Sequence, residues 1–178
     1  LYYKSSQKLN LTDDLFDVPI AEHTFDDKRG EGRVTFNGTM TALTDQELTS
    51  YSVWGTATAV YLPSTVKSIG NAAFRGCFHH IDFTISLPEG LERIGDYAFD
   101  GCYCLENITI PDGVTSIGAY AFYDCTALTS IVIPDSVTSI GSSAFYNCCR
   151  MTDITLPKGI TEINSYTFAL CTSLENVV

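Results

Sequence analysis

The residues best suited to chemistry are the seven cysteines, five of which recur at an almost constant interval. Residues at such an interval would lie about 5 Å apart if the segments carrying them stacked at the spacing of β-strands. That separation permits a disulfide, but side chains stacked in one column point the same way and not toward each other. We therefore predict a column of buried thiols that pack as small apolar side chains. The column contains Cys77, Cys102, Cys125, Cys148 and Cys171.

The other two cysteines, Cys104 and Cys149, lie outside this column. A bridge to the cysteine next to them in sequence would be strained, and the sequence leaves their redox state open. The spacings Cys-x-Cys and Cys-Cys lack the two-residue gap that is usual in closed zinc sites. No zinc site is predicted from them.

The remaining candidates for a metal or catalytic site are weak. His79 and His80 are paired, but Asp82 is the one carboxylate close to them, and this pattern favours a polar loop over a metal site. The motifs Gly-x-Ser-x-Gly and His-Glu-x-x-His and the phosphate-binding glycine loops are absent. The sequence therefore predicts no catalytic residue, no metal and no cofactor, and an enzyme built on these three residues is the weakest alternative.

Five tyrosines share two positions of the same periodic pattern. Tyr97, Tyr120 and Tyr166 each lie two residues after a glycine or asparagine, and Tyr123 and Tyr146 each follow a phenylalanine. If both positions face outward, they form a row of rings, and tyrosine is enriched in recognition surfaces. The alternative is that the rings stack on one another as a structural ladder.

A second candidate surface is the outward face of the predicted strands. Thr109, Val132 and Thr155 occupy the same strand position in three successive segments. Their side chains are small and uncharged, so this face suits a flat partner. Both surfaces are candidates for ligand binding.

The composition is that of a folded, acidic protein. Hydrophobic residues make up 45% of the chain, and 10 Lys and Arg against 21 Asp and Glu give a formal net charge of −11. This charge opposes binding to nucleic-acid phosphates and to anionic membrane surfaces. No apolar run approaches the roughly 20 residues of a membrane span. Nucleic acid and membrane insertion are therefore not expected.

A repeat of about 23 residues organises most of the chain. The phrase IPDSVTSIGSSAFYNC at 133–148 repeats IPDGVTSIGAYAFYDC at 110–125 almost unchanged. Five prolines mark the repeat and are spaced 25, 23, 23 and 23 residues apart, and a phenylalanine follows each of them eleven residues later. The prolines are Pro63, Pro88, Pro111, Pro134 and Pro157. A fixed period of this length indicates a solenoid of stacked coils, with the phenylalanines as an interior ladder. The phenylalanines are Phe74, Phe99, Phe122, Phe145 and Phe168.

Each part of the repeat has its own expected conformation. The alternating Ile-x-Ile before the proline predicts a short strand, and Val-x-x-Ile after it predicts a second extended segment that buries its isoleucine, up to Ile163 in the last coil. We predict a positive φ at the residue that follows this isoleucine. Ala-Phe-x-x-Cys is expected to form a compact turn or a single helical turn. The residues predicted to have positive φ are Gly70, Gly95, Gly118, Gly141 and Asn164.

A degenerate coil is predicted before the five regular ones. Val34 and Phe36 match the strand, Met40 and Leu43 match the second extended segment, and Leu48 matches the phenylalanine. The residues 174–178 match the start of a further strand, and the sequence leaves open whether coils follow Val178.

The consensus Leu-x-x-Ile-x-Ile-Pro-x-x-Val-x-x-Ile-Gly-x-x-Ala-Phe-x-x-Cys resembles the BspA-like leucine-rich repeat of bacterial surface antigens. The match covers about residues 34–178. This resemblance implies a secreted or cell-surface protein of an adhesin type, without enzymatic activity, whose ligands are host proteins or other surface molecules.

The combined prediction is a β-rich α/β solenoid, a right-handed leucine-rich-repeat superhelix with 23-residue coils. Residues 1–33 are expected to form an N-terminal cap, and residues 34–178 the solenoid, with the degenerate coil at 34–56. The expected function is non-enzymatic recognition of an extracellular or host protein or glycan at the cell surface or outside the cell. The alternative is a structural spacer within a larger surface protein. The oligomeric state is left open.

Overall fold

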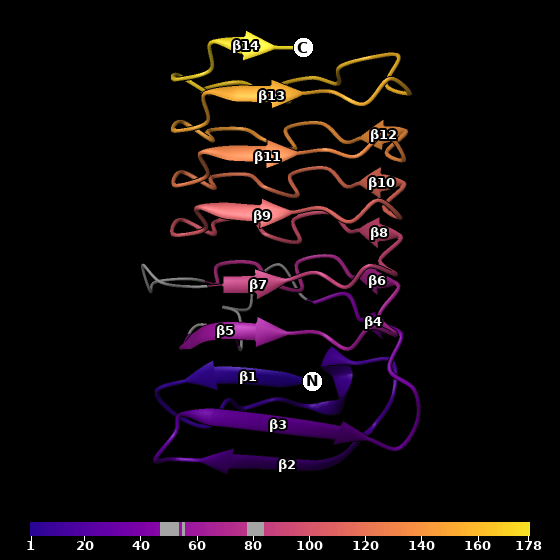
Figure 1. The fold of residues 1–178 in the computed structure, drawn as a ribbon, viewed down its shortest axis with the longest axis vertical. Coiled ribbons are helices and arrows are strands. Elements are labelled where there is room, and N and C mark those ends of the chain that lie inside the picture. Colours follow the sequence, from indigo (N-terminus) through magenta and orange to yellow (C-terminus); the bar gives the residue numbers. More distant parts are fainter. Residues whose placement is uncertain (47–53, 55, 78–83) are drawn as a thin grey trace.

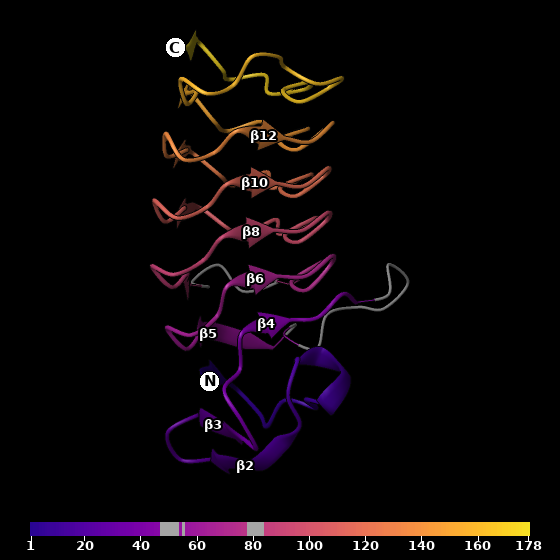
Figure 2. The ribbon, with the colours of Figure 1, turned by 90° about the vertical axis from the view of Figure 1, so that its right-hand side faces the viewer.

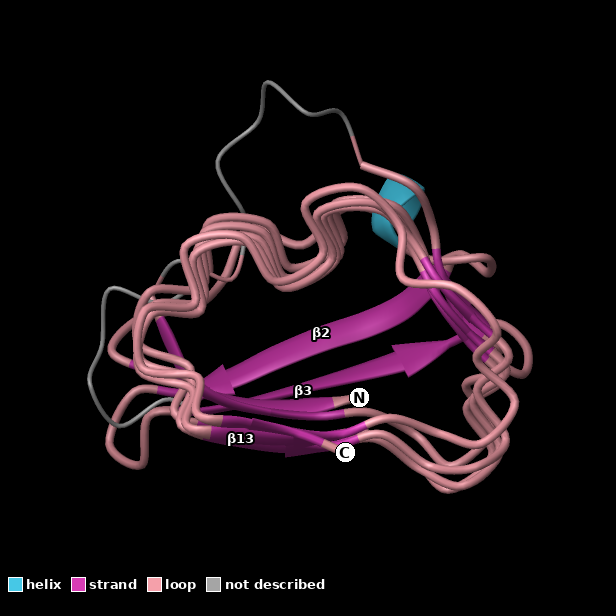
Figure 3. Ribbon diagram, turned by 90° about the horizontal axis from the view of Figure 1, so that it is seen from above, coloured by secondary structure: helices cyan, strands magenta, loops and turns pink. Residues whose placement is uncertain are grey.

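The computed structural model describes residues 1–46, 54, 56–77 and 84–178. The chain winds into a β-solenoid, with the N-terminal strands at one end of the stack and the C-terminus at the other (Figures 1 and 2). Seen along the stack, the coils superimpose as one closed outline that has strands on two walls and turns on the third (Figure 3). The prediction of a β-rich solenoid is confirmed.

The longer strands form one wall of the stack, in two sheets. One sheet has the order β2-β3-β1-β5-β7 and the other β14-β13-β11-β9, in which the solenoid strands pair in parallel. The strands are β1 (Tyr2–Ser5), β2 (Ile20–Asp26), β3 (Glu31–Phe36), β5 (Ala57–Tyr61), β7 (Thr84–Ser86), β9 (Asn107–Thr109), β11 (Ser130–Val132), β13 (Asp153–Thr155) and β14 (Asn176–Val177). We call this the long-strand wall.

A second wall carries two-residue strands, which form one parallel sheet in the order β12-β10-β8-β6-β4. They are β4 (Ala42–Leu43), β6 (Ser68–Ile69), β8 (Arg93–Ile94), β10 (Ser116–Ile117) and β12 (Ser139–Ile140). This is the second extended segment that Val-x-x-Ile predicts. We call it the short-strand wall.

The third wall, here called the turn wall, consists of residues 71–76, 96–101, 119–124, 142–147 and 165–170. It contains no strand, yet successive coils bond to each other along it. The N–H groups of Ala72, Phe74 and Gly76 donate to carbonyls of the next coil at 2.7–2.8 Å, and the following coils repeat the pattern. The turns are therefore as much a part of the stack as the strands.

Helix is nearly absent from the described residues, so the α/β part of the predicted fold class is not confirmed. The single helical element described is the 3₁₀ turn η1 (Asp13–Leu15). The turn wall does not become helical because two residues in each of its segments have positive φ, for example Tyr120 at 57° and Asp124 at 56°. A right-handed helix needs negative φ throughout.

The position of these positive φ angles also corrects the prediction for the glycine column. Gly118 and its counterparts, Asn164 included, do not have positive φ; the residues two positions later do. Glycine is needed for another reason: a Cβ at Gly118 would lie 2.5 Å from the Asp96 amide nitrogen and equally close to Gly95. Glycine at this position allows the backbones of neighbouring coils to approach closely. The residues with positive φ at that later position are Ala72, Tyr97, Tyr120, Ser143 and Tyr166.

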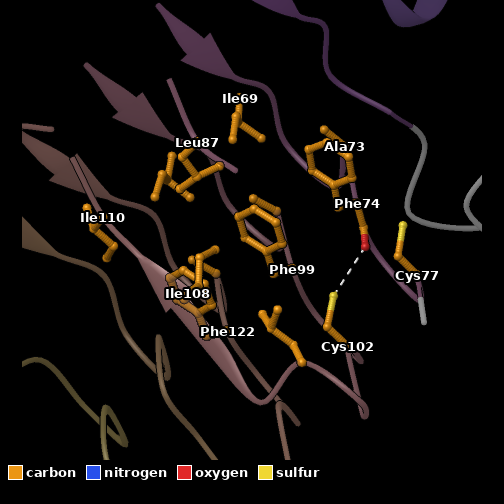
Figure 4. Packing of buried hydrophobic residues seen from close by; sticks show 14 of the residues in the cluster. Ile69, Ala73, Phe74, Cys77, Leu87, Phe99, Cys102, Ile108, Ile110 and Phe122 are labelled. Carbon is orange, nitrogen blue, oxygen red and sulfur yellow. Dashed lines mark hydrogen bonds between the residues drawn. The ribbon is translucent and has the colours of Figure 1, made fainter. Parts of the chain in front are cut away.

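The phenylalanine ladder fills the middle of the solenoid (Figure 4). The rings of Phe99, Phe122 and Phe145 lie nearly parallel, with centroids 5.2–5.4 Å apart, and are fully buried. The spacing shows that the coil repeat sets the distance between rings. At its N-terminal end Trp54 continues the ladder, 5.5 Å from Phe74.

The N-terminal segment meets the solenoid through β1, which pairs antiparallel with β5. The predicted degenerate coil is half right. Met40 and Leu43 are buried, and β4 pairs in parallel with β6 as a coil segment should. Val34 and Phe36, however, lie in β3, which pairs antiparallel with β1 and β2 and is not a coil strand. Leu48 lies outside the described residues.

Candidate functional site

Four of the five predicted tyrosines form one continuous group on the turn wall. Tyr97 stacks on Tyr120 with ring centroids 4.6 Å apart and planes 2° apart, and Tyr123 stacks on Tyr146 with 4.6 Å and 3°. Tyr120 and Tyr123 join the two pairs at 5.6 Å in a tilted contact. All four are partly exposed. The rings thus form a structural ladder and remain accessible along the wall, so both interpretations of the sequence describe part of the arrangement.

Three of the tyrosines have a left-handed backbone conformation, which is unfavourable for any residue other than glycine. Tyr97, Tyr120 and Tyr166 have φ of 56°, 57° and 60°. A left-handed conformation costs a non-glycine residue about 1–2 kcal/mol. Stacking of an offset ring pair contributes about 0.5–1.5 kcal/mol, which offsets part of this cost at Tyr97 and Tyr120.

Tyr166 has no such compensation. Its side chain is 71% exposed, and no ring contact is recorded for it within the described part of the chain. The residue at the same position of the preceding coil is Ser143, which offers no ring for stacking.

The structure adds Tyr103 to this surface. Its side chain is half exposed, and the turn at Gly101 lies beneath its ring: a Cβ there would be 3.7 Å from the Tyr103 hydroxyl oxygen. Sequence reasoning missed Tyr103 because tyrosine occurs at this position in one coil alone, so no column marks it. We call Tyr97, Tyr103, Tyr120, Tyr123 and Tyr146 together the tyrosine surface.

Carboxylates lie within the tyrosine surface, but they have partners. Asp100 accepts a 2.7 Å bond from the Arg75 side chain, and Asp124 accepts one of 2.8 Å from the Asn147 amide. Burial raises the pKa of Tyr97, and the neighbouring Tyr120 and Asp100 raise that pKa further. The pKa of Tyr123 is also raised, by burial and then by Asp124. These hydroxyl groups are neutral at physiological pH and are available as hydrogen-bond donors.

The second candidate surface is exposed on the long-strand wall. Thr109, Val132 and Thr155 lie in register on β9, β11 and β13, and each points away from the core. Val132 is 71% exposed. The row has no aromatic side chain and no strained backbone. Strand formation alone therefore explains these three residues.

The cysteine column links neighbouring coils of the stack. Cys102, Cys125, Cys148 and Cys171 are free thiols, and the thiol of Cys102 donates to the Phe74 carbonyl of the preceding coil at 3.4 Å (Figure 4). The same bond recurs from Cys125, Cys148 and Cys171. Burial raises the pKa of Cys102 well above its ordinary value, so the thiol stays protonated and unreactive.

The two cysteines outside the column are free as well. Cys149 donates to the Thr126 carbonyl at 3.6 Å, as threonine does at the same position in neighbouring coils. No group of His, Cys, Asp and Glu suited to a metal occurs among the described residues. His79, His80 and Asp82 lie outside them. No helix of the described chain is long and apolar enough to cross a membrane.

Comparison with known proteins identifies the class as bacterial leucine-rich-repeat solenoids. The BspA type leucine rich repeat region matches residues 47–175 in six copies. The chain therefore belongs to the BspA-type leucine-rich-repeat family. A comparison with curated protein sequences gives no match.

Solved structures of this class resemble the chain. A leucine-rich-repeat protein of T. pallidum is 27% identical, with a TM-score of 0.67 over 94% of this chain and 80% of its own. A leucine-rich cell surface protein of Faecalibacterium prausnitzii is 29% identical, with a TM-score of 0.66 over 79% of this chain and 35% of its own. The pneumococcal vaccine antigen PcpA is 25% identical, with a TM-score of 0.58 over 67% of this chain and 29% of its own. The chain thus spans about a third of the latter two.

Proposed function

We propose that this protein is a non-enzymatic recognition module that acts at the bacterial cell surface or outside the cell. It binds a protein or glycan ligand through the tyrosine surface and Tyr166. The observation that carries the proposal is the tyrosine surface, in which four rings stack in two pairs and stay partly exposed along the turn wall. Family membership and the cell-surface protein of F. prausnitzii support the location.

The chemistry of the tyrosine surface suits adhesion. Stacked rings give a rigid apolar area at low cost in side-chain entropy, and their hydroxyl groups add hydrogen bonds to polar partners. The carboxylates near them are bonded to Arg75 and Asn147. A ligand therefore meets few unpaired charges at this surface, which favours sugar rings or uncharged protein segments.

The test is a binding screen of the purified protein against extracellular-matrix proteins and host glycans. Two variants accompany it: Tyr97→Ala/Tyr120→Ala/Tyr123→Ala, and Thr109→Ala/Val132→Ala/Thr155→Ala as the matched change on the other surface. Saturable binding that the tyrosine variant loses and the strand variant keeps is the expected result. The single change Tyr166→Ala, which removes an exposed ring, should weaken binding without lowering the melting temperature.

The other outcomes are equally informative. Loss of binding in the strand variant alone would move the site to the long-strand wall. No binding by the unaltered protein would favour a structural spacer, the second candidate, which the unbroken turn-wall hydrogen bonds support. We further propose that residues 1–33 cap the stack, because β1 covers the edge of β5.

A further inference from the structure

One buried tyrosine connects the three strands at the N-terminal end of the stack. In this part of the sheet β3 lies between β1 and β2 (Figure 1). The ring of Tyr3, on β1, crosses β3 over Gly32, where a Cβ would overlap the ring carbons. The Tyr3 hydroxyl therefore reaches β2, and its oxygen lies 2.7 Å from His23 Nε2. Tyr3 is fully buried in this position.

The hydrogen bonds at this hydroxyl fix which atom donates to which. The Leu9 N–H donates to the Tyr3 oxygen at 3.2 Å. Within the described part of the chain, His23 Nε2 is the one other polar atom bonded to the hydroxyl. The Tyr3 O–H therefore donates to Nε2, because a buried donor without a partner would be costly. It follows that His23 is neutral and carries its proton on Nδ1.

Protonation of His23 removes the acceptor of this bond. A charged imidazole carries an N–H on both nitrogens, so Nε2 no longer accepts from Tyr3. The Tyr3 O–H is then left inside the fold without an acceptor until water reaches it. The His23 side chain is partly exposed, so a proton reaches the ring while the strands are still paired.

The charges around His23 also oppose its protonation. Lys8 lies in residues 6–12, the segment between β1 and η1, and its Nζ donates to the His23 carbonyl at 3.1 Å. Burial lowers the pKa of His23, and the charge of Lys8 lowers that pKa further. The Leu1 ammonium donates to the carbonyl of Val34, the residue opposite His23 on β3. The other charged residues of the three strands alternate onto the opposite face of the sheet: Lys4, Glu22, Asp26, Glu31 and Arg33.

We propose that Tyr3, His23 and Leu9 form a pH-sensitive latch, which holds residues 6–12 against β2 at neutral pH and releases them in mild acid. In the released form His23 has its ordinary pKa of about 6.5, higher than in the closed latch, so the released form binds the proton more readily. The latch is therefore closed above about pH 6.5 and weakens as the pH falls below that value. Release uncovers Leu9 and Leu11, which are buried in the closed latch. The coils of the solenoid and the tyrosine surface stay as they are.

The test is hydrogen exchange, expressed as protection factors so that the intrinsic effect of pH on exchange is removed. Between about pH 7.5 and about pH 5.5 the Leu9 amide of the unaltered protein should lose protection by about fivefold or more. In His23→Gln the side-chain oxygen accepts from Tyr3 at either pH, so protection should change by less than about twofold. The matched control is His79→Gln/His80→Gln, which removes the other two histidines and should respond to pH as the unaltered protein does.

A second measurement addresses the imidazole itself. The ¹⁵N NMR shifts of His23 in the unaltered protein should place the proton on Nδ1 at neutral pH, and the ring should titrate below its ordinary pKa of about 6.5. Tyr3→Phe keeps the buried ring but removes the acceptor of the Leu9 N–H, so Leu9 should be poorly protected at both pH values. The Leu1 ammonium is common to all these proteins, so its titration does not affect the comparison. An equal loss of protection in His23→Gln, a proton on Nε2, or titration at or above the ordinary pKa would each overturn the proposal.

Discussion

The central coils and the last coil have nearly the same sequence pattern but differ in structure. In the coil that contains β10, Ile117 is buried and its strand pairs on both sides. In the last coil the corresponding Ile163 is 58% exposed, and no strand forms there. The short-strand wall ends at β12, whereas the long-strand wall continues through β13 to β14.

One substitution in the pattern coincides with the difference. The glycine that follows the isoleucine in the central coils is Asn164 in the last coil. A Cβ at Gly95 would lie 2.7 Å from the Gly70 carbonyl carbon, and Gly118 and Gly141 have similarly close neighbours. A side chain at this position therefore keeps one coil away from the next. The comparison teaches that the glycine column sets the coil spacing on this wall and that the phenylalanine ladder alone does not.

The largest effect is expected for Phe122→Ala. Phe122 is fully buried between two rings, whereas Phe168 in the last coil is half-buried and stacks on Phe145 alone. Loss of the buried ring should lower the free energy of unfolding by about 3–5 kcal/mol, measured by urea denaturation. Phe168→Ala should cost clearly less. Equal losses would show that the last coil is packed as well as the central ones.

A smaller but substantial loss is expected for Gly118→Ala. The added methyl group meets the Asp96 amide nitrogen at 2.5 Å, and backbone cannot move away as a flexible side chain can. Overpacking of this kind costs about 1–3 kcal/mol. Gly159→Ala is the matched control, because a Cβ there meets its nearest neighbour at 3.6 Å. If both variants unfold at the same urea concentration, close approach is not the reason for the column.

The repeat made the wall structure predictable, because every coil must match its neighbours and each column therefore has one environment. The positive φ could not be placed, since glycine suits both a left-handed turn and a close approach, and sequence alone does not separate these at Gly118. Tyr103 was missed for a related reason. Tyrosine occurs at this position in one coil, and a column analysis detects what coils share.

A modest gain in stability is expected for Ala119→Asn. On the edge of the turn wall, Asn71 Oδ1 accepts the Asp96 N–H at 2.7 Å, and Asp96 Oδ1 accepts the Ala119 N–H at 2.8 Å. This chain of bonds stops at Ala119, because its side chain has no oxygen that could accept the Ser142 N–H. Asparagine should restore the bond and add about 0.5–1.5 kcal/mol to the free energy of unfolding.

The matched change Asp96→Ala removes an existing bond of the same kind, so it should lower the free energy of unfolding by a similar amount. Slower hydrogen exchange at the Ser142 amide would show that the new bond forms in Ala119→Asn. If this exchange slows while the stability is unchanged, the side-chain bonds follow from the stacking of the coils and do not strengthen it.

The smallest change in stability is expected for Asn164→Gly, which tests the comparison most directly. Burial of Ile163 should add about 1 kcal/mol. Most of this gain is offset, because glycine loses more conformational entropy on folding and the 2.7 Å bond from Asn164 to the Ile140 carbonyl is lost. The informative measurement is hydrogen exchange at Glu162 and Ile163, which should slow as a sixth strand of the short-strand wall pairs with β12. Unchanged exchange would mean that Asn164 is not what keeps the last coil apart from β12.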